Sequence, residues 1–180
     1  SFCSVGGVSY VETLKEVAKQ AVAVLAIGSC ASWGGIQAAR PNPTKSVAVH
    51  QVLTDKPVVK IPGCPPIPEV ITSVVMYYTL FGKLPALDFQ GKPTQFFGKT
   101  VHDTCYRKHF FKADQFVEHY GDNGSKAGWC LYKMGCRGPA TFNSCASMGW
   151  GQGLSYPIQA GASCIGCSNK DFWDDDPFNI

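Results

Sequence analysis

Residues 21–30 read AVAVLAIGSC, an uninterrupted apolar run that ends at Gly28 and is followed by a cysteine. A short continuous apolar run predicts a β-strand that is buried on both faces, as in the middle of a parallel sheet. Residues 58–64, VVKIPGC, repeat this pattern. We therefore expect two strands, over residues 21–27 and 58–61, each ending just before a cysteine.

Helices are expected on either side of these strands. Residues 10–20 have the pattern of an amphipathic helix, with acidic residues early and a lysine late. The apolar face of this helix would comprise Val11, Leu14, Val17 and Ala18. Residues 69–81 follow Pro68, which is tolerated in a first helical turn, and stop at Gly82. The order helix, strand, strand, helix predicts an α/β fold built on a parallel sheet.

The sequence changes character from about residue 86. This half contains twelve of the nineteen glycines and few apolar repeats longer than one helical turn, and we expect one short helix, over residues 114–120. A loop-rich segment of this length buries little apolar surface by itself, so we expect bound metal to stabilise it. We therefore divide the chain into an α/β domain, residues 1–85, and an irregular domain, residues 86–180.

The composition is that of a chain with one or two compact domains, because 45% of the 180 residues are hydrophobic and 16% are charged. The formal net charge of +3 provides no basic face for nucleic acid. The longest apolar run, residues 21–27, is much shorter than the roughly 20 residues needed to span a bilayer. The chain begins at Ser1 without a signal sequence, and we interpret this start as truncated or processed.

Nine cysteines are more than an ordinary domain of this size carries, and seven of them lie at or after Cys64. A disulfide framework is one explanation. The number is odd, however, and the chain is long enough to fold without such cross-links. Metal binding is the explanation that we favour.

Cys30 and Cys64 occupy equivalent places, since each follows one of the predicted strands. The carboxyl ends of parallel strands meet at one edge of a sheet, so the two thiols are expected to share a site there. They supply only two ligands, whereas a [4Fe-4S] cluster takes four. Cys3 lies before a helix, and we assign it no ligand role.

The second half contains seven further potential ligands. They are His102, Cys105, Cys130, Cys136, Cys145, Cys164 and Cys167. Two intervening residues, as between Cys164 and Cys167, form a turn that directs both thiolates to one metal or cluster. His102 and Cys105 have the same spacing. Nearby glycines allow the backbone to wrap an inorganic core and to direct N–H groups at its sulfides.

Zinc is the main alternative to iron-sulfur clusters. The first four of these ligands, up to Cys136, would form a zinc site of three cysteines and one histidine. The last three, from Cys145 onward, are too few for a closed structural zinc site and suit a three-iron cluster.

Five stretches of the sequence resemble the small subunit of nickel-iron hydrogenases. They are GSCASWGGIQAARPNPT (28–44), IPGCPPIPE (61–69), VHDTCYR (101–107), CLYKMGCRGPATFNSC (130–145) and YPIQAGASCIGCSNKDFWD (156–174). Long stretches at matching spacing are far more specific than an isolated CxxC. The resemblance implies that residues 1–85 are the C-terminal part of a flavodoxin-like domain that lacks the family's first strand and N-terminal CxxC.

The resemblance also implies three clusters with separate ligands. A proximal [4Fe-4S] cluster would be bound by Cys30 and Cys64, together with the absent N-terminal CxxC. A distal [4Fe-4S] cluster would be bound by His102, Cys105, Cys130 and Cys136. A medial [3Fe-4S] cluster would be bound by Cys145, Cys164 and Cys167, with Pro157 where a fourth thiolate could otherwise approach.

The function that the resemblance implies is electron transfer in an uptake-type hydrogenase. The nickel-iron centre that activates H2 would lie in a separate large subunit, so no catalytic residue is expected in this chain. Electrons would pass through the clusters to an external acceptor such as a cytochrome, with the distal cluster near Arg107 and Lys108 at the surface. The resemblance further implies a membrane-associated heterodimer on the periplasmic side, with room for a higher oligomer. The alternative is a zinc-stapled interaction module without redox function.

Overall fold

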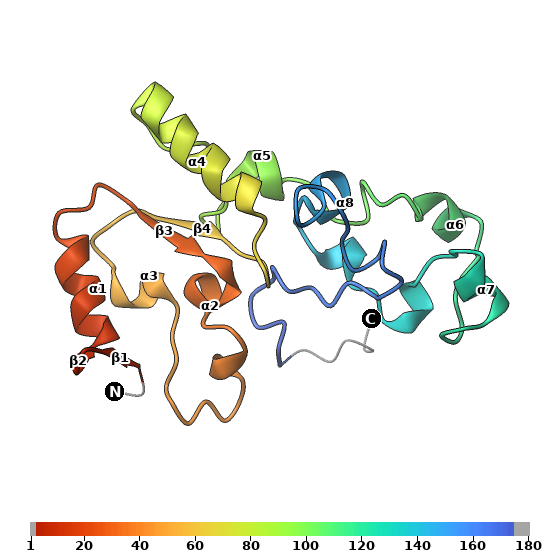
Figure 1. Cartoon of the computed structure of the whole chain (residues 1–180), viewed down its shortest axis with the longest axis horizontal. Coiled ribbons are helices and arrows are strands. Elements are labelled where there is room, and N and C mark those ends of the chain that lie inside the picture. Colours follow the sequence, from red (N-terminus) through yellow and green to blue (C-terminus); the bar gives the residue numbers. More distant parts are fainter. Residues whose placement is uncertain (1–2, 175–180) are drawn as a thin grey trace.

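The computed structural model of the protein describes residues 3–174 (Figure 1). The elements of the first half are β1 (Ser4–Val5), β2 (Val8–Ser9), α1 (Tyr10–Ala18), β3 (Val24–Ile27), α2 (Gly28–Trp33), α3 (Val49–Val52), β4 (Val58–Ile61) and α4 (Pro68–Phe81). Those of the second half are α5 (Thr94–Phe97), α6 (Lys108–Lys112), α7 (Asn123–Lys126) and α8 (Cys145–Met148). Short 3-10 turns occur at Ile36–Ala38, Tyr132–Met134 and Gly138–Ala140. None of the helices in the described part is long and apolar enough to cross a membrane.

Strands β3 and β4 pair in parallel at the centre of the first half (Figure 1). Val24 lies opposite Val58, and Ile27 lies opposite Ile61. The predicted α/β fold with a parallel sheet is therefore confirmed. β4 is largely buried, as expected, but the Ile27 side chain of β3 is 43% exposed, so the prediction of burial on both faces is wrong for β3. The difference lies in what covers each strand: Val59 and Ile61 of β4 belong to the buried apolar cluster, whereas Ile27 does not belong to it.

Helix α4 begins and ends as the sequence predicts. Pro68 occupies its first turn, and Gly82 ends it with a φ of 64°, in the left-handed region that favours glycine. Val70 and Val74 are buried in the same apolar cluster as β4. This helix therefore anchors the strand that leads to Cys64.

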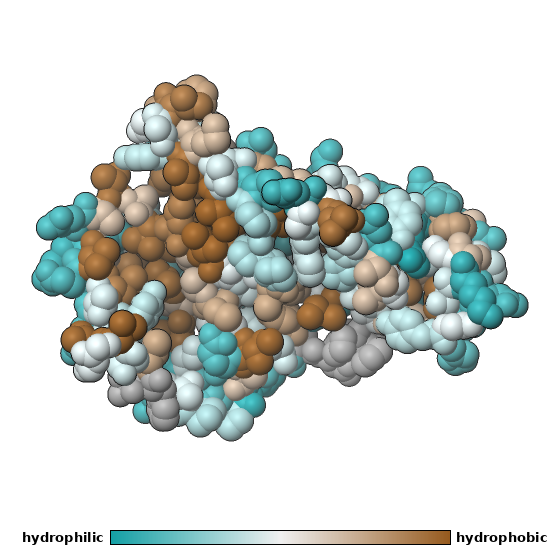
Figure 2. Space-filling model, in the orientation of Figure 1, coloured by the Kyte–Doolittle hydropathy of each residue, from teal (hydrophilic) through white to brown (hydrophobic). Residues whose placement is uncertain are grey.

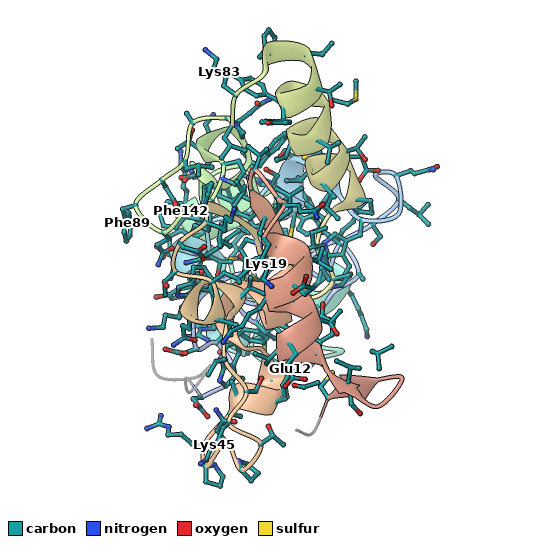
Figure 3. The ribbon with its side chains drawn as sticks, turned by 90° about the vertical axis from the view of Figure 1, so that its left-hand side faces the viewer. Glu12, Lys19, Lys45, Lys83, Phe89 and Phe142 are labelled. Carbon is teal, nitrogen blue, oxygen red and sulfur yellow. The ribbon has the colours of Figure 1, made fainter. Side chains whose placement is uncertain are left out.

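Helix α1 forms where it is predicted, but most of its expected apolar face is exposed. Only Ala18 of that face is buried, and the Val17 side chain is 69% exposed. Figure 2 shows apolar side chains gathered between α1 and α4, over β3. Figure 3 looks onto this side of the molecule, with Glu12 and Lys19 along α1. The described residues thus leave one side of the sheet without a complete cover.

The prediction of a helix over residues 114–120 is wrong. Helix α6 ends at Lys112, and Asp114 adopts a φ of 54°, which the helix cannot continue through. Phe116 then pairs with Cys130 in an isolated β-bridge. Pairing with a distant segment therefore replaces the local helix that the residue pattern suggested.

One apolar core joins the two halves of the chain. Val59 and Ile61 of β4 belong to the same buried cluster as Val101 and Ile158 of the second half. Trp33 Nε1, in the first half, donates a hydrogen bond of 3.0 Å to the backbone carbonyl of Ser168, in the second half. This packing brings the cysteines of the two halves close to one another.

Candidate metal centres

Cys30 and Cys64 lie beyond the carboxyl ends of β3 and β4, at the same edge of the parallel pair, as their sequence positions predict. Both residues are exposed. Gly35 passes so close to the first thiol that a Cβ added there would lie 2.5 Å from Cys30 Sγ. The Ser29 hydroxyl donates a hydrogen bond to the Cys167 carbonyl, so this edge of the sheet adjoins ligands from the second half.

A cavity of about 210 Å³ lies next to this edge. Its wall contains Cys64, Cys145, Cys164, Cys167 and Pro157. The rest of the wall is mainly apolar and includes Val101, Trp150, Tyr156 and Ile158. The structure therefore brings together the three cysteines that we assigned to the medial cluster, and it places Pro157 beside them.

Burial raises the pKa of Cys145, Cys164 and Cys167 to about 11 each. Such thiols are protonated at neutral pH, because an apolar cavity disfavours a charged thiolate. Iron binds the thiolate form, and the positive charge of the metal offsets the cost of burying that thiolate. The three cysteines thus form a donor set that suits a cationic occupant.

Two polar atoms in the cavity wall provide a second test of the fit. Trp150 Nε1 and the Tyr156 hydroxyl are buried and have no hydrogen-bond partner within residues 3–174. Buried donors are normally satisfied, and the sulfur atoms of a cluster and its ligands are acceptors. The residues present therefore fit an iron-sulfur cluster. Residue patterns do not reveal either donor, because neither has a ligand-like spacing.

Two of the residues that we assigned to the distal cluster, His102 and Cys136, lie beside Gly138, and Cys105 and Cys130 lie near Cys136. A Cβ added at this glycine would lie 3.4 Å from Cys136 Sγ and 3.9 Å from the His102 Cβ. The Cys105 N–H donates to the His102 carbonyl at 3.3 Å, which closes the turn between them. Burial raises the pKa of Cys130 and Cys136 and lowers the pKa of His102. The imidazole is therefore held in the neutral form, which is the form that binds metals.

A site for a single metal ion is not found in the described part of the chain. No three histidine, cysteine or carboxylate side chains of residues 3–174 converge closely enough to hold one ion. A structural zinc ion needs four ligands within about 2.3 Å of one point, whereas a cluster carries its ligands on separate irons. The eight cysteines from Cys30 onward all have free thiols.

Arg107 lies near the proposed distal ligands Cys130 and Cys136, and its side chain is buried. Its side chain is 6% exposed; Nε donates to the Tyr106 hydroxyl and Nη1 donates to the Trp129 carbonyl, both at 2.8 Å. These two hydrogen bonds hold the guanidinium inside the protein. Lys108 is partly exposed and pairs with Asp103 at 3.4 Å.

Cysteines grouped at a sheet edge, around a cavity and in the distal group are donor sets of the kind that iron-sulfur proteins use. Two sequence families match the chain. Residues 97–179 match the family that describes the C-terminal part of the NiFe/NiFeSe hydrogenase small subunit. Residues 3–78 match the family described as NADH ubiquinone oxidoreductase, 20 Kd subunit.

Individual relatives agree with these families. The chain is 58% identical to the uptake hydrogenase small subunit of Azotobacter vinelandii, over 98% of this chain and 49% of the relative. It is 56% identical to the uptake hydrogenase small subunit of Azotobacter chroococcum mcd 1, over 98% of this chain and 50% of the relative. The chain thus spans about half the length of the curated relatives that it matches.

Solved structures show the same relationship. The NiFeSe hydrogenase of Desulfovibrio vulgaris Hildenborough matches with a TM-score of 0.84 at 35% identity, over 95% of this chain and 66% of that one. The H2-activated NiFeSe hydrogenase of Dm. baculatum matches with a TM-score of 0.82 at 32% identity, over 92% of this chain and 61% of that one. The chain belongs to the family of nickel-iron hydrogenase small subunits.

Proposed function

We propose that this chain transfers electrons through iron-sulfur clusters as the small subunit of an uptake-type nickel-iron hydrogenase. The observation that carries the proposal is the cavity whose wall brings together Cys145, Cys164 and Cys167, with Pro157 beside them. The sequence identity of 58% and 56% to two uptake hydrogenase small subunits, in each case over 98% of the chain, supports the proposal independently.

The three groups of proposed ligands adjoin one another in series. Cys64 of the proximal group lies in the cavity wall, and its backbone hydrogen-bonds the Cys167 thiol. At the other end, the Cys164 backbone hydrogen-bonds the Cys136 thiol of the distal group. The Arg137 N–H also donates to the Cys164 carbonyl at 2.7 Å. The medial ligands therefore contact both other groups, which is the arrangement that a relay requires.

When bound, the clusters would supply one-electron redox chemistry at potentials set by ligand type, hydrogen bonds to sulfur and burial. We propose a proximal [4Fe-4S], a medial [3Fe-4S] and a distal [4Fe-4S] cluster. His102 replaces one anionic thiolate by a neutral ligand, and it should therefore raise the distal potential. Pro157 offers no thiolate, which supports three irons in the medial site. The mainly apolar wall around these ligands would limit the access of water to a bound cluster.

The partners are proposed on the same basis. A large subunit would hold the nickel-iron centre and face the exposed Cys30 and Cys64, whose two remaining cluster ligands would come from outside these 180 residues. An external acceptor such as a cytochrome would dock near the distal group, where Lys108 is partly exposed. A membrane-associated location on the periplasmic side and a higher oligomer of the heterodimer are proposals that rest on the family resemblance alone.

The experiment that tests this function uses the full-length small subunit purified together with its large subunit. Adding H2 should bleach the broad absorption near ~400 nm as the clusters are reduced. Cys164→Ser should interrupt the flow of electrons to an added dye acceptor. Cys3→Ser is the matched control, because Cys3 is exposed and lies outside the cavity wall. Dye reduction that is unchanged by Cys164→Ser would contradict the proposal.

A further inference from the structure

Trp150 and Tyr156 reach the cavity from one tight hairpin that follows α8. The backbone N–H of Trp150 donates to the Ser155 carbonyl at 2.6 Å, and these two residues form an isolated antiparallel bridge. Helix α8 itself begins at Cys145, one of the proposed medial ligands. The hairpin therefore holds both aromatic side chains in the same cavity wall as that cysteine.

Each aromatic side chain places a buried donor against a ligand sulfur. Trp150 Nε1 is buried and lies against the Cys145 thiol. Tyr156 is 5% exposed, and its buried hydroxyl lies against the Cys105 thiol of the distal group. Neither donor has an ordinary hydrogen-bond partner in the described part of the chain. A neutral thiol is a weak acceptor and a thiolate is a strong one, so both donors become satisfied when these cysteines ligate iron.

The other hydroxyl groups of the wall behave differently. Thr141, Ser163 and Ser168 line the same cavity, and each donates its hydroxyl hydrogen to a backbone carbonyl. The Thr141 hydroxyl also lies against the Cys164 thiol, but its hydrogen already has a carbonyl acceptor. The fold therefore supplies oxygen acceptors for these three hydroxyl groups and none for Trp150 Nε1 or the Tyr156 hydroxyl. A buried donor without a partner is costly, which argues that the two positions are completed by the bound clusters.

We propose that Trp150 and Tyr156 are a pair of tuning donors, each serving a different cluster. Trp150 donates to the Cys145 sulfur of the medial cluster, and Tyr156 donates to the Cys105 sulfur of the distal cluster. This inference rests on the proposed function. Reduction adds negative charge that the ligand sulfur shares, so a donor stabilises the reduced state more than the oxidised state. Each donor therefore raises the reduction potential of its own cluster.

Two substitutions test the pair, and each is the control for the other. Tyr156→Phe removes only a hydroxyl group, and Trp150→Phe removes the indole N–H. The full-length complex is poised at a series of potentials, and the medial and distal clusters are followed separately by electron paramagnetic resonance. At a fixed potential, Tyr156→Phe should shift the distal cluster toward its oxidised form by roughly fivefold to tenfold and leave the medial cluster within about twofold. A tenfold shift corresponds to ~59 mV for one electron.

Trp150→Phe should produce the reverse pattern, with the medial cluster shifted and the distal cluster unchanged. Shifts below about twofold in both variants, or equal shifts of both clusters, would overturn the inference. A wild-type complex that contains no clusters would instead overturn the proposed function.

Trp150→Phe also shortens a side chain in the cavity wall, and the variant could lose its medial irons for that reason alone. In that case wild-type protein with nitrogen-15-labelled tryptophan decides the question by electron-nuclear double resonance of the medial cluster. A coupling to the indole nitrogen and its exchangeable proton supports the hydrogen bond. The absence of that coupling overturns it.

Discussion

Replacing Pro157 by cysteine should change the number of irons that the cluster in the cavity contains. Pro157 shares the cavity wall with Cys64 and with the three proposed medial cysteines, and it offers neither a thiolate nor an N–H group. Its carbonyl accepts a hydrogen bond of 2.8 Å from the Ala162 N–H, and this bond does not depend on the side chain. Pro157→Cys therefore raises the number of proposed medial thiolates from three to four. The expected result is one additional iron, which converts a [3Fe-4S] site into a [4Fe-4S] site.

The variant should fold, because losing the proline ring costs roughly 0.4–1 kcal/mol through the greater freedom of the unfolded chain. The assay is iron analysis combined with the magnetic signal of the oxidised three-iron cluster, which should disappear. Pro157→Ser is the control, since it removes the ring without adding a thiolate and should keep three irons. A well-folded Pro157→Cys protein that retains the three-iron signal would refute the placement of Pro157 at the open position.

Three further outcomes are expected. His102→Ala should change the spectrum and potential of the distal cluster only. The control is His109→Ala, which alters a histidine with no ligand-like spacing and should change neither quantity. An unaltered distal signal in His102→Ala would show that His102 is not a ligand. Ile61→Ala should lower the free energy of unfolding in urea by about 2–5 kcal/mol, because Ile61 is fully buried. Ile27→Ala, at its half-exposed partner in the β3–β4 register, should cost clearly less, and equal losses would contradict the observed burial. Finally, since burial raises the pKa of the three medial thiols to about 11, each ligand must release a proton to bind iron. The yield of cluster reconstitution, read from the absorbance near ~400 nm, should therefore rise from about pH 7 to about pH 9, and a falling yield would count against these ligands.

Residue patterns predicted the elements that depend on local signals. Pro68 marks the start of α4 and Gly82 marks its end, because a first-turn proline and a left-handed glycine act through the backbone at those positions alone. The meeting of Cys30 and Cys64 at one edge also follows from simple geometry, since parallel strands end together.

Local patterns do not predict the features that distant contacts determine. Residues 114–120 have a short helical pattern, but the pairing of Phe116 with Cys130 could not be read from that segment. The burial of Arg107 depends on acceptors from Tyr106 and Trp129, and nothing in the order of residues distinguishes it from Lys108. The structure brings the predicted ligands into adjoining groups, whereas their assignment to particular clusters stays a prediction.

The donors in the cavity wall were missed for a related reason. Cysteine spacing identifies ligands, because two or three residues of separation direct side chains to one point. Trp150 and Tyr156 reach the cavity only because a hairpin turns them toward it, and an aromatic residue in a sequence more often indicates core packing.

The central claim is that this chain binds iron-sulfur clusters through its grouped cysteines, and analysis of iron and acid-labile sulfide tests it most directly. The distal group has four proposed ligands and the medial group has three, so the chain by itself should bind about seven irons with accompanying sulfide. Adding the segment that completes the proximal site should raise the count to about eleven. The loaded protein should absorb broadly near ~400 nm and lose that absorption on reduction. A folded, colourless protein that contains zinc, or no metal, and no labile sulfide would contradict the account.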